Sequence, residues 1–259
     1  MDAIQILPWL LCIALLLAIF VMELNIRPRL KKEFWRGIKL SYVTPDDAPN
    51  VAGELWLRSL SLRFNNSRGS GFALDNEYGL TAYHVFFDKQ GNLRAATAQF
   101  SHGLFPHQKV SVVASDKEHD IVLFKFETPL SFPFKPMMVS DEELATMNED
   151  TERDVTTSDI VFVMAPRPSG NVWLQGAIYF EEGVSDITVI NFGEGEPQDC
   201  VQPGDSGSVG LDVFGNIRTV VIYKLKSKKE GFVAVEAGGG VHTGVIRTFL
   251  KAHWPNYQG

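Results

Sequence analysis

From Val51 onward the chain consists of short apolar runs separated by turn signals, and this spacing limits the folds that it can adopt. The first group of runs comprises "GELWLRSLSLRF", "GSGFAL", "GLTAYHVF", "QKVSVVAS" and "DIVLFKF". The second comprises "DIVFVMA", "NVWLQGAIYF", "ITVINF", "SVGLDVFGNIRTVVIYK" and "GFVAVEA". Runs this short favour strands over helices, and closely spaced turns favour antiparallel neighbours. The pattern predicts an all-β fold of sandwiches or barrels rather than parallel strand–helix units.

Three further segments complete the expected fold. Gly215 and Asn216 lie between two apolar runs and predict the tip of a β-hairpin. Residues 140–159 are acidic and poor in aliphatic side chains, so we expect an exposed connection between the two groups, with room for a helical turn. A helix is predicted near the end of the chain, and one of its faces carries Ile246, Phe249, Leu250 and Trp254.

The first part of the chain has a different character. Ala3–Met22 contains twenty residues without a charged side chain, about the length that a helix needs to cross a bilayer. A cleaved signal peptide and a buried core helix are the alternatives, but no basic residue precedes the segment and no small-x-small cleavage site follows it. We therefore predict one transmembrane helix within residues 1–23 that anchors the chain to a membrane.

Residues 24–50 are predicted to form a basic linker. Between residues 27 and 39 it carries six cations opposed only by Glu33, namely Arg27, Arg29, Lys31, Lys32, Arg36 and Lys39. Under the positive-inside rule these cations hold the following part of the chain in the cytoplasm, and they would also suit anionic lipid headgroups. Residues 41–50 are rich in turn formers and predict a spacer.

Composition excludes several classes of function. At 259 residues, 45% of them hydrophobic, the chain can bury a substantial core. Its net charge of −7 argues against nucleic acid as a partner, because phosphate binding requires a basic face. Two cysteines alone, Cys12 and Cys200, make a disulfide framework improbable. The histidines and carboxylates lack metal-ligand spacing such as HExxH, so we expect no metal and no other cofactor.

Ser206 lies in the stretch "CVQPGDSGSVG", and two interpretations of it are open. Gly, Asp and Ser are the residues that any surface turn favours. A serine hydroxyl becomes a nucleophile only with a base within hydrogen-bond reach, and that base needs a third group to orient it. Histidine suits the role of base because its pKa lies near neutrality. The interpretation of Ser206 therefore depends on distant residues.

His84 and Asp120 are the candidates for these two roles. His84 ends an apolar run in "GLTAYHVFFD", and Asp120 opens the apolar run "IVLFKF". Taken singly, each has an ordinary interpretation, His84 as a structural histidine at a strand end and Asp120 as a turn residue. The remaining histidines stand in less suggestive settings: His102, His107, His119, His242 and His253.

Together, "LTAYH", "DIVLFKF" and "GDSGS" resemble the three signature segments of the trypsin- and chymotrypsin-like serine peptidases, in that family's order of His, Asp and Ser. The resemblance extends over residues 52–256. It implies two antiparallel six-stranded β-barrels, at about 51–139 and 155–245, and a C-terminal helix at about 246–254. With the predicted anchor, the chain resembles a membrane-anchored member of the bacterial type.

The resemblance implies hydrolysis of peptide bonds through an acyl-enzyme. His84 would act as general base, Asp120 would orient the imidazole, and Ser206 would attack the carbonyl carbon. The backbone N–H groups of Gly204 and Ser206 would form the oxyanion hole. A binding or scaffolding module without turnover is the alternative, although such relatives usually lose a residue of the triad. An α/β-hydrolase would need G-x-S-x-G and the order Ser, Asp, His, and neither occurs.

The chain departs from the family at its amino-terminal end. Zymogen members are cleaved before an "IVGG"-like start, and the new amino terminus pairs with the Asp that precedes the nucleophile. Here "NVAGE" follows no basic residue. We therefore expect Asp205 to have another partner and the enzyme to need no such cleavage.

The specificity pocket is inferred from the same resemblance. Cys200 and Val201 would line it, with Tyr223 along its wall and His242 near its floor. No Asp stands where trypsin-type members select Lys or Arg, so a basic preference is not expected. His242 would either favour an acidic or amide side chain or be a core histidine satisfied by backbone, and Cys200 could be a small buried apolar residue.

The predicted location is a single-pass membrane protein whose peptidase domain faces the cytoplasm. The lack of the family's usual disulfides resembles its bacterial and viral branches and agrees with this face. Bacterial relatives with an anchor often face outward, however, so the opposite face stays open. The polypeptide substrate and the oligomeric state are not specified by the sequence.

Overall fold

The computed structural model describes residues 48–64, 67–100, 102–103, 105–141, 146–147, 160–181, 187–191, 201–226 and 236–258. The predicted anchor at 1–23 and most of the linker at 24–50 lie outside these residues. Within them, every helix is too short or too polar to cross a membrane.

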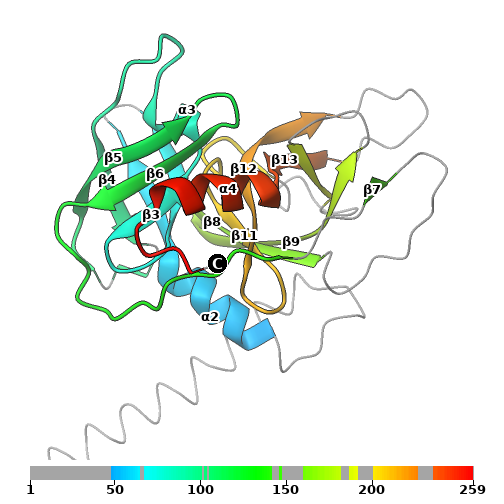
Figure 1. Cartoon of the computed structure of the whole chain (residues 1–259), viewed down its shortest axis with the longest axis horizontal. Helices are drawn as coiled ribbons and strands as arrows, with labels where there is room; N and C mark the ends of the chain where they lie inside the picture. Colours follow the sequence, from blue (N-terminus) through cyan, green and yellow to red (C-terminus); the bar gives the residue numbers. More distant parts are fainter. Residues whose placement is uncertain are drawn as a thin grey trace, which may run out of the picture. The chain divides into compact units, whose positions relative to one another are not determined.

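Six strands from the first half of the chain close into an antiparallel barrel (Figure 1). In order around the barrel they are β1 (Ser59–Arg63), β2 (Arg68–Ala73), β3 (Tyr78–Thr81), β6 (Ile121–Phe126), β5 (Gln108–Asp116) and β4 (Ala96–Phe100). Strand β4 pairs back to β1, which closes the ring. Buried aromatic rings fill part of the core, where Phe126 packs against Phe100 and Phe124 at centroid distances of 5.9 and 5.6 Å. The antiparallel barrel predicted for the first half is confirmed.

The second half contributes a seven-stranded sheet. Its strands are β7 (Thr146–Met147), β8 (Ile160–Arg167), β9 (Gly170–Glu181), β10 (Ile187–Asn191), β11 (Val209–Leu211), β12 (Ile217–Lys226) and β13 (Glu236–Val241). The order is β10-β13-β12-β11-β8-β9-β7, and β10 also pairs with β9. Asp212 and Asn216 pair across the turn between β11 and β12, where Gly215 has a φ of +86°. The predicted hairpin tip is confirmed.

The first predicted strand was partly wrong. Residues 53–58 of "GELWLRSLSLRF" belong to helix α2 (Ala48–Arg58), and only the remainder forms β1. The physical reason is the spacing of Val51, Leu55 and Arg58, which lie on one helical face and are all buried. The turn-rich spacer predicted at 41–50 likewise gives way to this helix from Ala48.

Helix α4 (Thr243–His253) follows β13 and lies across the boundary between the barrel and the second sheet (Figure 1). It contacts β12 on one side and β5 and β6 on the other. Its predicted apolar face is confirmed, because four side chains on it are buried: Ile246, Phe249, Leu250 and Trp254. The connection predicted at 140–159 falls mostly outside the described residues.

Candidate active site

His84 and Asp120 come from two elements that the barrel brings together. His84 lies in α3 (Tyr83–Phe86), one helical turn after β3, and Asp120 ends the turn that leads into β6. Nδ1 of His84 lies 2.7 Å from Oδ2 of Asp120, and the backbone N–H of His84 donates to Oδ1 at 2.9 Å. One carboxylate therefore holds both the ring and the backbone of His84.

This contact determines which ring nitrogen of neutral His84 carries the proton. A carboxylate accepts hydrogen bonds and donates none, so Nδ1 must be the protonated nitrogen. Nε2 is then left as an acceptor. The His84 side chain is 48% exposed, so the ring can be reached by a second group.

The barrel itself positions α3. The N–H of Tyr83 donates to the carbonyl oxygen of Asp120 at 3.1 Å. On the same helix, Phe86 packs against Phe124 of β6 with ring centroids 5.8 Å apart. A helix of four residues has little stability of its own, so the placement of His84 depends on these contacts.

Ser206 lies in a loop held between β2 of the barrel and β12 of the second sheet. The N–H of Ser70 donates to the carbonyl oxygen of Ser206, and the Ser70 hydroxyl donates to the carbonyl oxygen of Gly204, both at 2.8 Å. From the other side, the N–H of Gly207 donates to the carbonyl oxygen of Val221 at 2.7 Å. The candidate nucleophile is thereby attached to both halves of the fold.

Gly207 permits this close approach. Its φ is +91°, and a methyl group at its Cα would overlap the carbonyl oxygen of Ser70 and Oγ1 of Thr81. The Thr81 hydroxyl also donates to the carbonyl oxygen of Ser70 at 2.7 Å. A side chain at residue 207 would therefore push the loop away from β2.

The Ser206 hydroxyl has a specific partner in this structure. Its Oγ donates to the backbone carbonyl oxygen of Ile222 in β12 at 2.9 Å. A hydroxyl has one proton, so a proton given to Ile222 is not at the same time given to His84. His84 lies in the short helix α3 rather than at the end of a strand, Asp120 directly precedes β6, and Ser206 lies in a turn-rich loop. The His84–Asp120 pair is formed while Ser206 bonds elsewhere.

Among residues 204–208 of the loop, two backbone amides have no backbone acceptor within the described residues. The N–H groups of Asp205, Gly207 and Ser208 donate to backbone carbonyls, whereas those of Gly204 and Ser206 do not. Gly204 has a φ of +100°, a conformation that glycine adopts without strain. These two amides are the ones that the sequence assigned to an oxyanion hole.

Asp205 has the alternative partner that the sequence led us to expect. Arg167, at the end of β8, donates from Nε to Oδ1 at 3.1 Å and from a terminal nitrogen to Oδ2 at 2.6 Å. The N–H of Gln202 donates to Oδ2 at 2.8 Å. The two charged side chains are nearly inaccessible, with exposed fractions of 5% and 1%. The expectation of a second partner for Asp205 is confirmed.

The residues predicted for the specificity pocket have varied settings. Val201 is buried in the core of the second sheet with Val161, Leu174 and Val221. The Nδ1 atom of His242 accepts a hydrogen bond from the N–H of Gly244 at 3.0 Å and caps α4. Tyr223 lies in β12, with no side-chain position described, and Cys200 lies outside the described residues. Their part in specificity stays a prediction.

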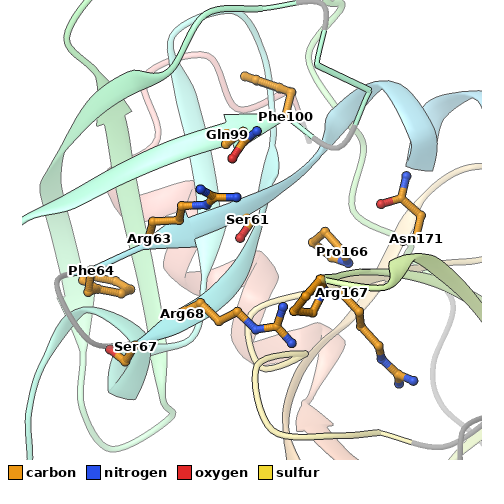
Figure 2. A pocket seen from close by; sticks show the side chains of 12 residues that line it. Ser61, Arg63, Phe64, Ser67, Arg68, Gln99, Phe100, Pro166, Arg167 and Asn171 are labelled. Atoms are coloured by element: carbon orange, nitrogen blue, oxygen red, sulfur yellow. The ribbon is translucent and has the colours of Figure 1, made fainter.

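A cavity of about 620 Å³ lies between the barrel and the turn after β8 (Figure 2). We call it the arginine cavity, and its lining comprises Ser61, Arg63, Phe64, Ser67, Arg68, Gln99, Phe100, Pro166, Arg167, Pro168, Gly170 and Asn171. Figure 2 shows the side chain of Arg68 extending from β2 towards the end of β8, while the guanidinium of Arg167 points away from Arg68. No cluster of His, Cys, Asp or Glu side chains suited to a metal ion occurs in the described part of the chain.

Sequence reasoning missed three residues that shape the site. Ser70 attaches the loop of Ser206 to the barrel, Thr81 donates to the carbonyl oxygen of Ser70, and Arg167 pairs with Asp205. The glycine-rich "GSGFAL" hinted at a close backbone approach near Ser70. Nothing in the pattern around Arg167 distinguishes it from other arginines.

The sequence matches no protein-family model and no curated protein. The structure is similar to the crystal structure of the serine endoprotease from Yersinia pestis, with a TM-score of 0.56 and 16% sequence identity. The alignment covers 79% of this chain, which spans 65% of that one. At this identity the likeness concerns the fold, a mostly β structure with a closed six-stranded barrel and a C-terminal helix.

Proposed function

We propose that the chain is a serine-type endopeptidase that uses His84, Asp120 and Ser206. The observation that carries the proposal is the double contact of the Asp120 carboxylate, which binds the ring N–H and the backbone N–H of His84. This arrangement leaves Nε2 of His84 as a proton acceptor on an accessible ring. The likeness of the fold to a serine endoprotease supports the same reaction class.

In the proposed reaction, Ser206 rotates about its Cα–Cβ bond and exchanges Ile222 for Nε2 of His84. The hydroxyl oxygen attacks the peptide carbonyl carbon while its proton passes to Nε2. The imidazolium stays bound to Asp120 and returns the proton to the leaving amine. Water then enters, gives a proton to Nε2 of His84 and attacks the acyl carbon. His84 passes this proton to Oγ of Ser206 as the acyl–oxygen bond breaks, which releases the carboxylic acid and regenerates Ser206.

The negative charge on the carbonyl oxygen needs donors during both steps. The N–H groups of Gly204 and Ser206 are suited to this role because no backbone acceptor in the described residues engages them. Removal of one such donor typically lowers the rate by about 10²–10³. The donors are backbone groups, so their geometry depends on the anchoring of the loop by Ser70 and Arg167.

A fluorophosphonate probe tests the proposal on the full chain in detergent. Labelling of the wild type, absent from Ser206→Ala and strongly reduced in His84→Ala, is the expected result. Hydrolysis of a quenched peptide library should show the same dependence. Equal labelling of wild type and Ser206→Ala would overturn the proposal.

A second candidate is a peptide-binding module with the same fold and little turnover. It is favoured by one observation, the hydrogen bond from Ser206 to Ile222 in place of His84. This candidate predicts no labelling of a well-folded wild type, combined with measurable binding of peptides. The same two measurements therefore separate it from the enzyme.

Three further features belong to the proposal. We infer that the second sheet forms the second barrel, supported by the pairing of β10 with both β13 and β9.

The residue before the scissile bond is proposed to contact four residues, namely Cys200, Val201, Tyr223 and His242. Residues 1–23 are proposed to anchor the chain in a membrane, with the peptidase on the cytoplasmic face. Resistance to alkaline extraction and protease accessibility in intact cells test the last statement.

A further inference from the structure

We propose that the arginine cavity binds a carboxylate side chain of the substrate, within the first three residues after the scissile bond. The inference rests on the proposed peptidase function and adds the substrate chemistry on the leaving-group side. It would make the enzyme selective for acidic residues at those positions.

The charge of the cavity points to an anion. Three arginines line it, and no Asp or Glu is among its twelve lining residues. Arg167 is engaged by Asp205, whereas Arg63 and Arg68 have no ion-pair partner in the described part of the chain. The whole protein carries a net charge of −7, so a local excess of positive charge is not a property of its surface in general. Arginine also presents a planar fork of donors that matches a carboxylate.

The position of Arg68 links the cavity to the reacting groups. A Cβ placed on Gly204 would lie 3.0 Å from Nε of Arg68. Gly204 is the residue whose N–H is proposed to bind the oxyanion. Arg68 is therefore in van der Waals reach of the loop that would hold the scissile carbonyl. Arg63 lines the same cavity from the neighbouring strand β1.

The two sides of the loop indicate which half of the substrate enters the cavity. On one side, β12 accepts the Ser206 hydroxyl at Ile222, and the proposed pocket for the residue before the scissile bond includes Tyr223 on the same strand. On the opposite side, β2 contacts the loop through Ser70, two residues after Arg68. Because the residue before the scissile bond is proposed to contact Tyr223 on β12, we expect the leaving half to be directed towards β2 and the cavity.

The remaining lining suits a peptide better than a free ion. Phe64, Phe100 and Pro166 supply apolar surface in the same cavity. A volume of about 620 Å³ falls within the range of roughly 300–1,000 Å³ typical of ligand pockets.

Quenched fluorogenic peptides test the inference on the full chain in detergent. Starting from a hydrolysed library peptide, Asp, Ala or Lys is placed in turn at each of the first three positions after the scissile bond. We expect kcat/KM to be about tenfold higher with Asp than with Ala at one of these positions, as for a charge-assisted hydrogen bond that is partly screened. The preference should shrink when ionic strength rises from about 0.01 M to about 1 M, because the Debye length falls from about 30 to 3 Å.

Three substitutions in the cavity and one control outside it assign the preference to the cavity. Arg68→Ala should reduce the Asp-to-Ala ratio to about one, and Arg68→Lys should retain part of it. Arg63→Ala gives an independent second variant at the cavity. Lys251→Ala removes one positive charge from the exposed face of α4 and should leave the ratio unchanged.

The outcomes separate this inference from the proposed function. Hydrolysis without acidic preference at all three positions, or with a preference only before the scissile bond, would overturn the cavity assignment and leave the peptidase intact. Absence of both labelling and hydrolysis would overturn the peptidase function. In that case the inference is tested by binding alone. The affinities of a fluorescent Asp-containing peptide and of its Ala analogue are measured for wild type and for Arg68→Ala. Equal affinities would refute it, and an Arg68-dependent difference of about tenfold would support it.

Discussion

Residue 120 is constrained by its backbone as well as by its side chain. Asp120 has a φ of +55°, a left-handed conformation in which Asn and Asp are enriched among residues other than glycine. Its carboxylate binds His84 at two atoms. The replacement that tests its chemistry must therefore tolerate the same φ, and Asn meets that condition.

We predict that Asp120→Asn lowers kcat by about 10³–10⁴ with little change in the midpoint of urea unfolding. The amide N–H₂ donates instead of accepting, so His84 would have to turn its unprotonated nitrogen towards residue 120. Nε2 would then carry the proton and lose its capacity as a base. Steady-state hydrolysis of a library peptide measures the change.

The chain contains a matched control for this variant. Asp116 binds Nδ1 of His119 at 2.6 Å in a similar pair on the same turn. Asp116→Asn should leave kcat within about twofold of wild type, since no proposed step uses His119. A loss of activity in Asp120→Asn of less than tenfold would contradict the assigned role.

At the scale of elements, the end of β8 supports the loop of the nucleophile. The Arg167–Asp205 pair joins them. In zymogen members of the trypsin-like peptidases, which the sequence resembles, a new amino terminus pairs with the corresponding Asp. Both side chains are buried, so each charge depends on the other for compensation. We expect the pair to hold this loop in place without cleavage of the chain.

We expect Arg167→Met to reduce the free energy of unfolding by about 3–5 kcal/mol and to abolish hydrolysis, because Asp205 would be left buried without its cation. The double variant Arg167→Met, Asp205→Asn should recover much of the lost stability, since no isolated charge remains. Urea unfolding monitored by circular dichroism gives both values. A single variant as stable as wild type would show that the pair is not needed to stabilise the fold.

Another element contact predicts a pH dependence of stability. His102 lies against the rings of Trp56 and Phe100, and its Nε2 contacts the carbonyl oxygen of Leu57 at the end of α2. Burial lowers the pKa of His102 from the ordinary value of 6.5, and the contact with Leu57 opposes this only in part. The neutral form is therefore favoured in the folded state.

The free energy of unfolding is therefore highest above pH 6.5 and decreases as the pH falls below this value. The reason is that His102 binds a proton more readily in the unfolded chain than in the folded one. Below pH 6.5, the free energy of unfolding of the wild type should fall relative to that of His102→Phe by at most about 1.4 kcal/mol per pH unit. Urea unfolding of both proteins between pH 8 and 5 provides the comparison, in which carboxyl groups common to both cancel. A constant difference would contradict the prediction.

At the scale of the whole described fold, the first and the last described segments each pack against the half of the fold that is distant in sequence. Helix α2 precedes the barrel but contacts β8 of the second sheet. Beyond α4, Trp254 and Asn256 return to the barrel, where both donate to Oδ2 of the buried Asp75, at 3.1 and 2.7 Å. Each half is therefore completed by a segment attached to the other.

We predict that Asp75→Ala lowers the free energy of unfolding by about 3 kcal/mol, since two donors at the C-terminal segment lose a charged acceptor. Unfolding should remain a single transition, with tryptophan fluorescence and circular dichroism giving the same midpoint. Asp141→Ala serves as control because its side chain is 86% exposed. Two separate transitions in wild type would show that the halves are independent.

The sequence predicted those parts of the site that local patterns specify. The motifs around His84, Asp120 and Ser206, most strands of the first barrel and the buried face of α4 could be read from short motifs and periodicity, and the closure of the barrel was implied by the resemblance. Strand β4 was not among the predicted runs, and residues 83–86 of "GLTAYHVF" form helix α3 instead of strand. Residues 53–58 were misassigned because alternation and helical spacing coincide over so few positions. Arg167 and Ile222 could not be identified, because their roles follow from tertiary contacts with distant residues.

Because the Ser206 hydroxyl bonds to Ile222, its availability as a nucleophile depends on the relative populations of two side-chain conformers. If Ser206 exchanges between Ile222 and His84, each increment of about 1.4 kcal/mol in favour of Ile222 makes the reactive conformer about tenfold rarer. A reagent that reacts only with this conformer then reports its fractional occupancy as a reduced apparent rate. Slow but complete labelling would thus measure the free energy of the hydrogen bond between Ser206 and Ile222. The rotamer of this one side chain would then limit the rate of the proposed reaction.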